Sequence, residues 1–257
     1  MLVRSDILTA ADGEPVAVEN PEGKGTALII CEHASRRLPA RAGDLGLGAA
    51  ALQSHIAWDP GALALARLLS KALGATLVYQ RFSRLIYDCN RPPESIDAMP
   101  ATSEIYRIPG NESLSTAERY ARTAALYVPF HDRISQIIAE RATRGQDTVV
   151  VTIHSFTPVY RGKARAVEVG ILHDSDSRLA DVMLARADEE TAFLTLRNEP
   201  YGPADGVTHT LQLHALPQGL QNVMIEVRND LIADETGLGV MAGFLTGLLQ
   251  DCSAALQ

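Results

Sequence analysis

The sequence predicts an α/β protein built on an open sheet, because strand-like and helix-like segments alternate along its whole length. Short apolar runs rich in valine and isoleucine, such as residues 27–31, 149–153 and 223–225, have the length and composition of buried strands. The chain has 257 residues, of which 46% are hydrophobic, enough for a sizeable core. We find no repeat, low-complexity segment or linker, and expect a single domain over residues 1–257.

In the first half of the chain, residues 27–31 form the first expected strand, followed by a loop rich in glycine, arginine and proline. Asp59 before Pro60 is typical of a helix start, with Asp59 as the N-cap, and this helix should end at Gly74. Strands are expected at residues 75–79 and 84–87. Residues 92–111, which contain several prolines and few apolar repeats, should be a long loop.

In the second half, the spacing of Ser115 and Glu118 fits a capping box and predicts the start of a long helix. Pro129 should kink or split that helix, because proline cannot donate a backbone hydrogen bond. A turn-rich segment is expected at residues 198–202. The remaining expected elements are strands at residues 148–153, 167–172, 193–196 and 222–227 and helices at residues 177–187 and 235–249.

The formal net charge of -8 disfavours a nucleic-acid groove as the main function, because such domains usually carry a basic surplus. Three cysteines in a chain of this size do not suggest a disulfide framework and favour a reducing compartment. Residues 1–20 lack the apolar core of a signal peptide, and no uncharged apolar stretch is long enough to span a membrane. We therefore expect a cytoplasmic protein with a small-molecule substrate and neither nucleic-acid nor membrane partners.

Polar clusters follow four of the apolar runs directly, at the positions where strands should end. Because ligands of open α/β sheets bind at the carboxyl ends of the strands, these clusters mark the expected site. They contain two histidines, several carboxylates and two arginines, the inventory of a metal-assisted hydrolase with an arginine that binds an anion. The four clusters are Glu32-His33-Ala34-Ser35, Asp88-Cys89-Asn90-Arg91, His154-Ser155 and Glu226-Val227-Arg228.

His33, Asp59 and His154 are the candidate metal ligands, because a catalytic zinc takes three nitrogen, oxygen or sulfur ligands and leaves one position for water. The alternative is that both histidines are hydrogen-bonded structural residues and that Asp59 only caps a helix. Glu32 is a further possible ligand, or a partner that orients a histidine, and His55 is open to the same second role.

Glu226 is the candidate catalytic base, since a buried carboxylate with a raised pKa can take a proton from water and pass it to a leaving amine. Alternatively, Glu226 and Arg228 form a structural ion pair, because a strand period of two points both side chains to the same face.

The pair Asn90 and Arg91 has the donors to bind the carboxylate of an amino-acid substrate, with the planar fork of the arginine matched to two oxygens. Arg84 either polarises the scissile carbonyl or pairs with Asp88. Arg91 and Arg165 are each open to two interpretations, a substrate-binding arginine or a solvated one.

At these residues the chain resembles the N-formylglutamate amidohydrolase family, through stretches that run in order along nearly its whole length. The resemblance implies a three-layer α/β/α, phosphorylase/hydrolase-like fold with a mixed, mainly parallel sheet, similar to that of zinc carboxypeptidases. The stretches are Cys31-Glu32-His33-Ala34-Ser35, His55-Ile56-Ala57-Trp58-Asp59-Pro60-Gly61-Ala62, Ser83-Arg84-Leu85-Ile86-Tyr87-Asp88-Cys89-Asn90-Arg91-Pro92, Tyr127-Val128-Pro129-Phe130-His131, Ile153-His154-Ser155-Phe156-Thr157-Pro158, Asn198-Glu199-Pro200-Tyr201 and Ile225-Glu226-Val227-Arg228-Asn229-Asp230-Leu231.

The resemblance also implies that Asn90 and Arg91 grip a substrate carboxylate and that Glu226 acts as the base. One departure is that the carboxypeptidase pattern His-x-x-Glu is absent after the first strand, where Arg36 stands three residues beyond His33. Asp59 is then the nearest replacement for the missing carboxylate ligand. Further pocket residues would be Asn198, Glu199, Tyr201 and Arg228, whereas His131 is open to a plain packing role.

The sequence thus leads to the hypothesis of a metal-dependent amidohydrolase, with Zn²⁺ or another divalent ion, that removes a formyl or other short acyl group from an N-acylamino acid such as N-formylglutamate. Alternatives within the same class are hydrolysis of another N-acylamino acid and carboxypeptidase action on short peptides. Alternatives of other classes are a non-catalytic binding protein for an acidic metabolite and a thiol hydrolase that uses Cys31 or Cys89.

Overall fold

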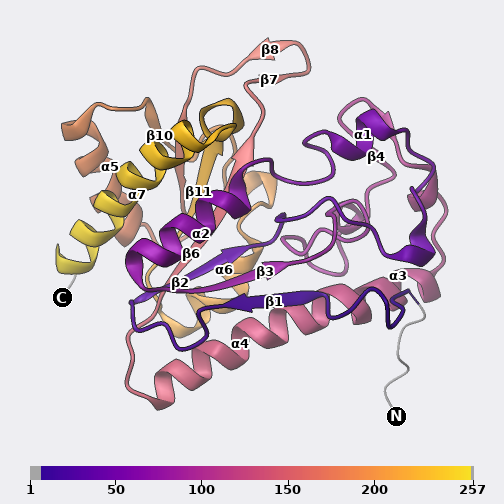
Figure 1. Ribbon diagram of the computed structural model, residues 1–257, viewed down its shortest axis with the longest axis horizontal. Helices are drawn as coiled ribbons and strands as arrows, with labels where there is room; N and C mark the ends of the chain where they lie inside the picture. Colours follow the sequence, from indigo (N-terminus) through magenta and orange to yellow (C-terminus); the bar gives the residue numbers. More distant parts are fainter. Residues whose placement is uncertain (1–6, 256–257) are drawn as a thin grey trace.

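The computed structural model describes residues 7–255 of the chain, with side chains through Gln250 (Figure 1). The first six residues, part of the segment in which we expected no signal peptide, lie outside the described part. The strands are β1 (Val16–Glu19), β2 (Ala27–Cys31), β3 (Thr76–Gln80), β4 (Thr102–Ser103), β5 (Tyr106–Arg107), β6 (Val149–Phe156), β7 (Val159–Tyr160), β8 (Lys163–Ala164), β9 (Val169–Leu172), β10 (Thr195–Arg197) and β11 (Asn222–Arg228).

Helices alternate with these strands and are mostly short. The α-helices are α1 (Ala49–Gln53), α2 (Ala62–Leu73), α3 (Thr116–Arg122), α4 (Val128–Thr143), α5 (Arg178–Glu190), α6 (His209–His214) and α7 (Glu235–Ala255). The π-helix η4 (Thr123–Tyr127) joins α3 to α4. The 3-10 turns are η1 (Ala40–Ala42), η2 (Ile96–Ala98), η3 (Pro109–Asn111), η5 (Pro203–Asp205), η6 (Leu216–Gln218) and η7 (Asn229–Ile232).

Seven of the described strands form one sheet, in the order β1-β3-β2-β6-β11-β9-β10. The β2–β3, β2–β6, β6–β11 and β9–β10 pairs are parallel, whereas the β1–β3 and β9–β11 pairs are antiparallel. The sheet is therefore mixed and mainly parallel, as the resemblance implied. Strands from both ends of the chain meet in it, since β2 and β11 both pair with β6.

Helices cover both faces of the sheet, which gives the expected three layers (Figure 1). Ile29 and Ile225 point to the face covered by α2, α5 and α7, where they belong to one apolar cluster. Leu28 and Met224 point to the opposite face, where α4, α6 and several loops close a second cluster. Because neighbouring residues of a strand face opposite sides, each central strand needs apolar side chains at successive positions, which is the continuous pattern of the sequence.

The strand expected at residues 84–87 is wrong, because this run forms turns. Leu85 and Ile86 are buried, but the backbone N–H of Ile86 donates to the carbonyl of Ser83. The Ser83 hydroxyl accepts from the N–H of Leu85 and donates to the carbonyl of Ala57. The run is therefore apolar because it packs beneath loops, not because it lies in the sheet.

The expected helix cap at Asp59 is also wrong, because α2 begins at Ala62 with Gly61 as its N-cap. Gly61 has a φ of 82°, a left-handed conformation that glycine adopts without strain, and a Cβ there would meet Ile232 at 2.7 Å. The extra turn leaves the Asp59 side chain available for other contacts.

The capping box is confirmed, with the Ser115 hydroxyl accepting from the N–H of Glu118 and the Glu118 carboxylate accepting from the N–H of Ser115. The predicted disturbance at Pro129 is seen as the π-helix η4 directly before α4. Without an N–H at Pro129, the carbonyl one turn earlier cannot be satisfied in the ordinary helical register.

Strand β1, a short edge strand without a clear apolar pattern, was not predicted.

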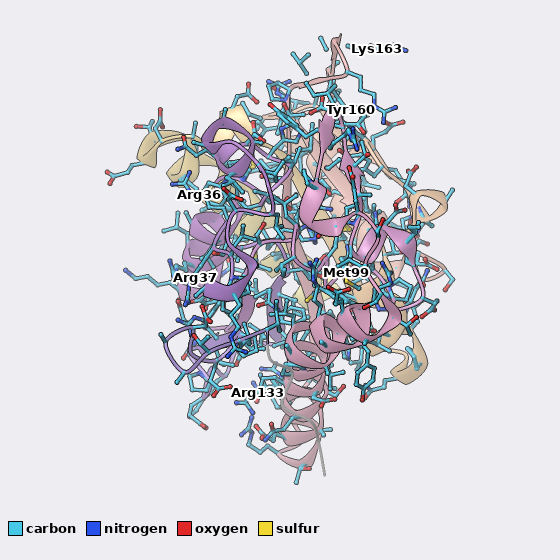
Figure 2. All side chains as sticks on the ribbon, turned by 90° about the vertical axis from the view of Figure 1, so that its right-hand side faces the viewer. Arg36, Arg37, Met99, Arg133, Tyr160 and Lys163 are labelled. Atoms are coloured by element: carbon cyan, nitrogen blue, oxygen red, sulfur yellow. The ribbon has the colours of Figure 1, made fainter. Side chains whose placement is uncertain are left out.

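Two small hairpins, β4–β5 and β7–β8, stand outside the sheet. The hairpin β7–β8, which carries Tyr160 and Lys163, projects from one end of the molecule (Figure 2). Among the described residues, no helix combines the length and the apolar character that crossing a bilayer requires.

A close backbone approach occurs at Gly170 in β9. A Cβ at this position would lie 1.9 Å from the carbonyl oxygen of Glu199, far inside contact distance. Gly170 is also the cross-strand neighbour of Glu226 in β11. The missing side chain therefore lets the segment around Glu199 pack directly against the sheet beside Glu226.

We expect Gly170→Ala to lower the free energy of unfolding by about 1–3 kcal/mol, because the backbone must move to admit a methyl group. Urea denaturation monitored by circular dichroism measures this change. The matched control is Gly239→Ala in α7, where a Cβ meets nothing within 4 Å and alanine should raise stability by about 0.5–1 kcal/mol. Equal stability of Gly170→Ala and the parent protein would show that the close approach is not required.

Candidate functional site

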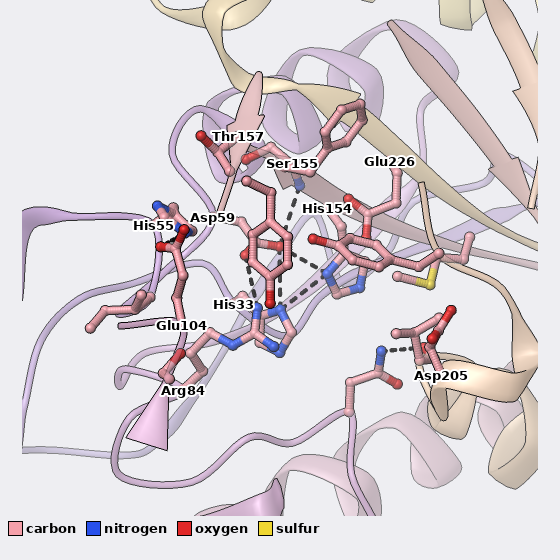
Figure 3. A pocket seen from close by; sticks show the side chains of 18 of the residues that line it. His33, His55, Asp59, Arg84, Glu104, His154, Ser155, Thr157, Asp205 and Glu226 are labelled. Atoms are coloured by element: carbon pink, nitrogen blue, oxygen red, sulfur yellow. Dashed lines mark hydrogen bonds and ion pairs between the residues drawn. The ribbon is translucent and has the colours of Figure 1, made fainter. Parts of the chain in front are cut away.

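A pocket of about 270 Å³ opens at the carboxyl ends of β2, β6 and β11, where the sequence placed the site. His33 follows β2, His154 lies near the end of β6 and Glu226 lies in β11. Asp59 comes from the loop before α2 and reaches the same place. Figure 3 shows the side chains of His33, Asp59 and His154 pointing toward one another inside the pocket.

The three candidate metal ligands offer one atom each to a common point. The Asp59 Oδ2 atom lies 2.9 Å from His154 Nδ1 and 3.2 Å from His33 Nδ1, and the two Nδ1 atoms lie 3.1 Å apart. A tetrahedral zinc with ligands at 2.0–2.1 Å requires separations of about 3.3 Å between donor atoms. When each ring carries its proton on Nε2, the two Nδ1 lone pairs point at one another, and a metal ion or an added proton between them removes the repulsion. The donor set and its spacing therefore fit a divalent ion.

The other nitrogen of each imidazole faces a second carboxylate. His33 Nε2 lies 2.7 Å from Asp88 Oδ1, and His154 Nε2 lies 3.1 Å from Glu32 Oε2. A carboxylate accepts the N–H of such a ring and leaves the lone pair of the other nitrogen for a metal. The structure thus places Glu32 beside His154 and outside the donor triangle, as an ion-pair partner whose contact lacks hydrogen-bond geometry.

The buried site has a surplus of carboxylates, and the surplus shifts the pKa values around it. Burial opposes the charged forms, yet the neighbouring carboxylates raise the pKa of His33 and of His154. Likewise, burial opposes ionisation of Asp59, but the two imidazoles lower the pKa of Asp59 far below its usual value. The site therefore favours positive charge at the position where the three donor atoms meet.

Arg84 lies in the pocket but both ends of its guanidinium are occupied. Its Nη1 donates to Asp59 Oδ1 at 3.3 Å and its Nη2 donates to Asp88 Oδ2 at 2.7 Å. Burial opposes the charge, but the carboxylates of Asp88 and Asp59 raise the pKa of Arg84 above its usual value. This arginine thus links a candidate ligand to the carboxylate that orients His33.

Glu226 is buried, lines the pocket and is the cross-strand partner of His154. Burial raises the pKa of Glu226 to about 7. Arg228, two residues on, turns away to Asp230 at 2.8 Å and to Glu168 at 3.4 Å. The structure therefore does not form the ion pair between Glu226 and Arg228 that the strand period allowed.

Asn90 and Arg91 both line the pocket, and both also hold the segment before α6. The Asn90 amide donates to the carbonyl of Val207 and its oxygen accepts from the N–H of Thr210 at 3.1 Å. Arg91 Nη1 donates to the carbonyl of Gly206. These bonds fix the direction of both side chains.

Arg165 lies behind the aromatic wall of the pocket. Its guanidinium lies 4.6 Å from the ring centre of Tyr160 and 4.9 Å from that of Tyr201. Its Nη2 donates to the hydroxyl of Tyr201 at 2.9 Å. Tyr201 and Tyr160 line the pocket, so Arg165 acts on it through these rings.

Four residues expected to bind the substrate do not line the pocket, namely Arg165, which lies behind the aromatic wall, and Asn198, Glu199 and Arg228. The Asn198 side chain accepts from the N–H of His173 at 2.9 Å, and the Glu199 backbone lies against Gly170 on the outer part of the sheet. This segment crosses the end of β9, so only Tyr201 reaches the pocket. Arg228 lies beyond the turn at the end of β11, where Glu168 and Asp230 hold it.

Sequence reasoning missed the two hairpin loops that complete the pocket. Glu104, at the turn of β4–β5, pairs with His55 at 3.1 Å and accepts from the N–H of Arg161 in the turn of β7–β8 at 3.2 Å. Glu104 and Asp205 lie on opposite sides of the pocket (Figure 3). These residues follow no apolar run, so the strand-end signal could not reveal them.

The two described cysteines do not contribute a nucleophile to this pocket. Cys31 and Cys89 are fully buried and lie outside its lining. Burial raises the pKa of both thiols above the usual range, which suppresses the reactive thiolate. This environment argues against the thiol-hydrolase alternative.

The comparisons with known proteins agree with this geometry. The crystal structure of gene product Atu2144 from Agrobacterium tumefaciens is 64% identical, with a TM-score of 0.95, and the match covers 97% of this chain and 99% of that one. An N-formylglutamate amidohydrolase from Ralstonia eutropha JMP134 shares the fold, with a TM-score of 0.66 and 20% identity over 93% of this chain and 97% of that one. A comparison with curated proteins gives no significant match.

The family-level match is extensive and contains the whole pocket. Residues 25–233 match the sequence profile of N-formylglutamate amidohydrolase, a span that includes His33, Asp59, His154 and Glu226. This chain therefore belongs to the N-formylglutamate amidohydrolase family.

Proposed function

We propose that this protein is a divalent-metal-dependent amidohydrolase that removes a formyl or other short acyl group from an N-acylamino acid such as N-formylglutamate. The observation that carries the proposal is the triangle of donor atoms from His33, Asp59 and His154 beside the buried carboxylate of Glu226. Family membership supports amide hydrolysis as the reaction class. The small volume of the pocket favours a substrate of metabolite size.

The proposal assigns the metal site to His33, Asp59 and His154, with Asp88 orienting the imidazole of His33 and Glu32 in an ion pair with that of His154. A bound divalent ion such as Zn²⁺ would supply Lewis-acid activation of the acyl carbonyl and lower the pKa of water to about 7. Arg84 keeps Asp59 and Asp88 fixed and ionised, so that the ligand set keeps its geometry.

The proton chemistry falls to Glu226. With a pKa of about 7, its carboxylate can take a proton from the attacking water and then deliver it to the nitrogen of the leaving amine. Arg91, with Asn90 beside it, anchors the free carboxylate of the amino acid. Tyr201, held by Arg165, encloses the remaining part of the substrate.

The first prediction is that activity depends on a bound ion. Protein stripped with a chelator should lose nearly all hydrolysis of formyl, acetyl and succinyl amino acids, and one equivalent of zinc should restore it. The measurement is metal analysis combined with release of the free amino acid across this panel. Hydrolysis of peptides alone would favour carboxypeptidase action, and binding without hydrolysis would favour a non-catalytic binding protein.

The second prediction concerns the base. Glu226→Gln should reduce kcat by about 10²–10⁴-fold, because the amide cannot accept the proton, while metal content and KM stay close to those of the parent. In the parent, kcat/KM should fall on the acid side as Glu226 becomes protonated; the pKa of about 7 belongs to the site without an ion, and a bound cation should lower it. The matched control is Glu168→Gln, outside the pocket, which should leave kcat unchanged. Near-normal turnover of Glu226→Gln would exclude this role.

The third prediction concerns the anchor for the carboxylate. Arg91→Ala should raise KM by about 10–100-fold for substrates with a free carboxylate, because a charge-assisted hydrogen bond is lost. The methyl ester of the same substrate should be hydrolysed with an unchanged KM. Arg107→Ala, which removes an exposed arginine outside the pocket, is the control. An equal effect on acid and ester would contradict the anchor.

A further inference from the structure

A group of buried histidines lies behind the candidate metal site, between α4 and α6, and none of them lines the pocket. His131 of α4 and His214 of α6 are 5% and 2% exposed, and their rings stack with centres 5.0 Å apart. Burial is the largest cause that lowers the pKa of His131 to about 3 and of His214 to about 4. Both rings are therefore neutral near pH 7.

The hydrogen bonds of the two rings determine which nitrogen of each ring carries the proton. His131 Nε2 lies 2.8 Å from the carbonyl oxygen of Cys89, which can only accept, so Nε2 carries the proton and Nδ1 does not. His214 Nε2 lies 2.8 Å from that bare Nδ1 and must donate to it. His214 Nδ1 then accepts from the Ser135 hydroxyl at 3.3 Å. The whole chain of donors thus ends on one backbone carbonyl.

That carbonyl belongs to the segment that orients the candidate metal site. Asp88, directly before Cys89, places Oδ1 2.7 Å from His33 Nε2 and accepts there from the N–H of Asn90 at 2.9 Å. Its Oδ2 accepts from Arg84 at 2.7 Å. The carbonyl of Cys89 therefore lies between the carboxylate that aims His33 and the amide of Asn90 that lines the pocket.

We propose that His131 and His214 are positioning residues of the metal centre, which act by holding the Cys89 carbonyl and thereby the Asp88 carboxylate against His33. The inference rests on the proposed function, because it assigns His33 to a metal. Packing alone would explain why the two rings are buried, but not why their hydrogen bonds all donate in the direction of the Cys89 carbonyl. Two hydrophobic side chains would fill the same space without a donor for the carbonyl.

Two substitutions of His131 test whether the hydrogen bond to the Cys89 carbonyl is required, or whether any polar amide side chain at this position is enough. In His131→Gln the amide nitrogen can occupy the place of Nε2 and donate to the Cys89 carbonyl. In His131→Asn the amide nitrogen occupies the place of Nδ1 and cannot reach that carbonyl. We expect His131→Asn to weaken zinc affinity by about 10-fold, the lower end of the effect of losing a group that orients a metal ligand, because His131 acts on Asp88 through the Cys89 carbonyl. His131→Gln should stay within a few-fold of the parent.

The experiment measures zinc dissociation constants of the full chain by competition with a chromophoric chelator, together with the melting temperature of each metal-free protein. Ile134→Val, a buried substitution on the same helix that removes none of the hydrogen bonds of His131 and His214, is the control for an effect on stability alone. It should lower the melting temperature and leave zinc affinity unchanged. Long-range ¹H–¹⁵N spectra of the parent should show both His131 and His214 protonated at Nε2 at pH 7.

Weakened zinc binding in His131→Asn with near-parent binding in His131→Gln supports the inference. Three results would overturn it. Zinc affinity could be equal in all variants, or it could fall together with the melting temperature in Ile134→Val as well. The third result is a His131 that carries its proton on Nδ1. A parent protein that binds neither zinc nor another divalent ion would instead contradict the proposed function on which the inference rests, so the two failures are distinguishable.

Discussion

The carboxylate of Asp59 is the contact on which the rest of the site depends. Its Oδ2 faces both imidazoles and accepts from the backbone N–H of Ser155, while its Oδ1 accepts from Arg84. One buried carboxylate thus joins the end of β2, the end of β6 and the turns after β3. Such a charge is tolerated in the interior only when it is paired on all sides, and here the pairing itself gathers the candidate ligands.

The register of the central strands supplies the second constraint. Because β2 and β11 both run parallel to β6, residues at the same level of three strands come side by side. Glu226 is directly opposite His154, and Glu32 follows β2 on the other side of the same imidazole. His154 therefore lies between two carboxylates with different surroundings. Glu32 forms an ion pair with His154 Nε2, whereas Glu226 faces the pocket with a raised pKa.

Contacts outside the pocket extend this ordering to the segments around it. Gly170 lets one segment pack against β9, and that segment continues to Tyr201 at the pocket wall. The neutral rings of His131 and His214 connect α4 and α6, on the same face of the sheet as the pocket, to the Cys89 carbonyl. The geometry of the site is thus fixed by backbone contacts as well as by charges, which keeps the distances between its side chains short.

The sequence by itself determined the fold class, most strands and the group of residues His33, His154 and Glu226, because strand length, apolar runs and the polar residues after them are local properties. Only the tertiary structure decided that residues 84–87 form turns and that Asp59 faces the site instead of capping a helix. It alone decided that Arg228 leaves the pocket and that Glu104 enters it. Those outcomes depend on packing between distant segments, which no local pattern records.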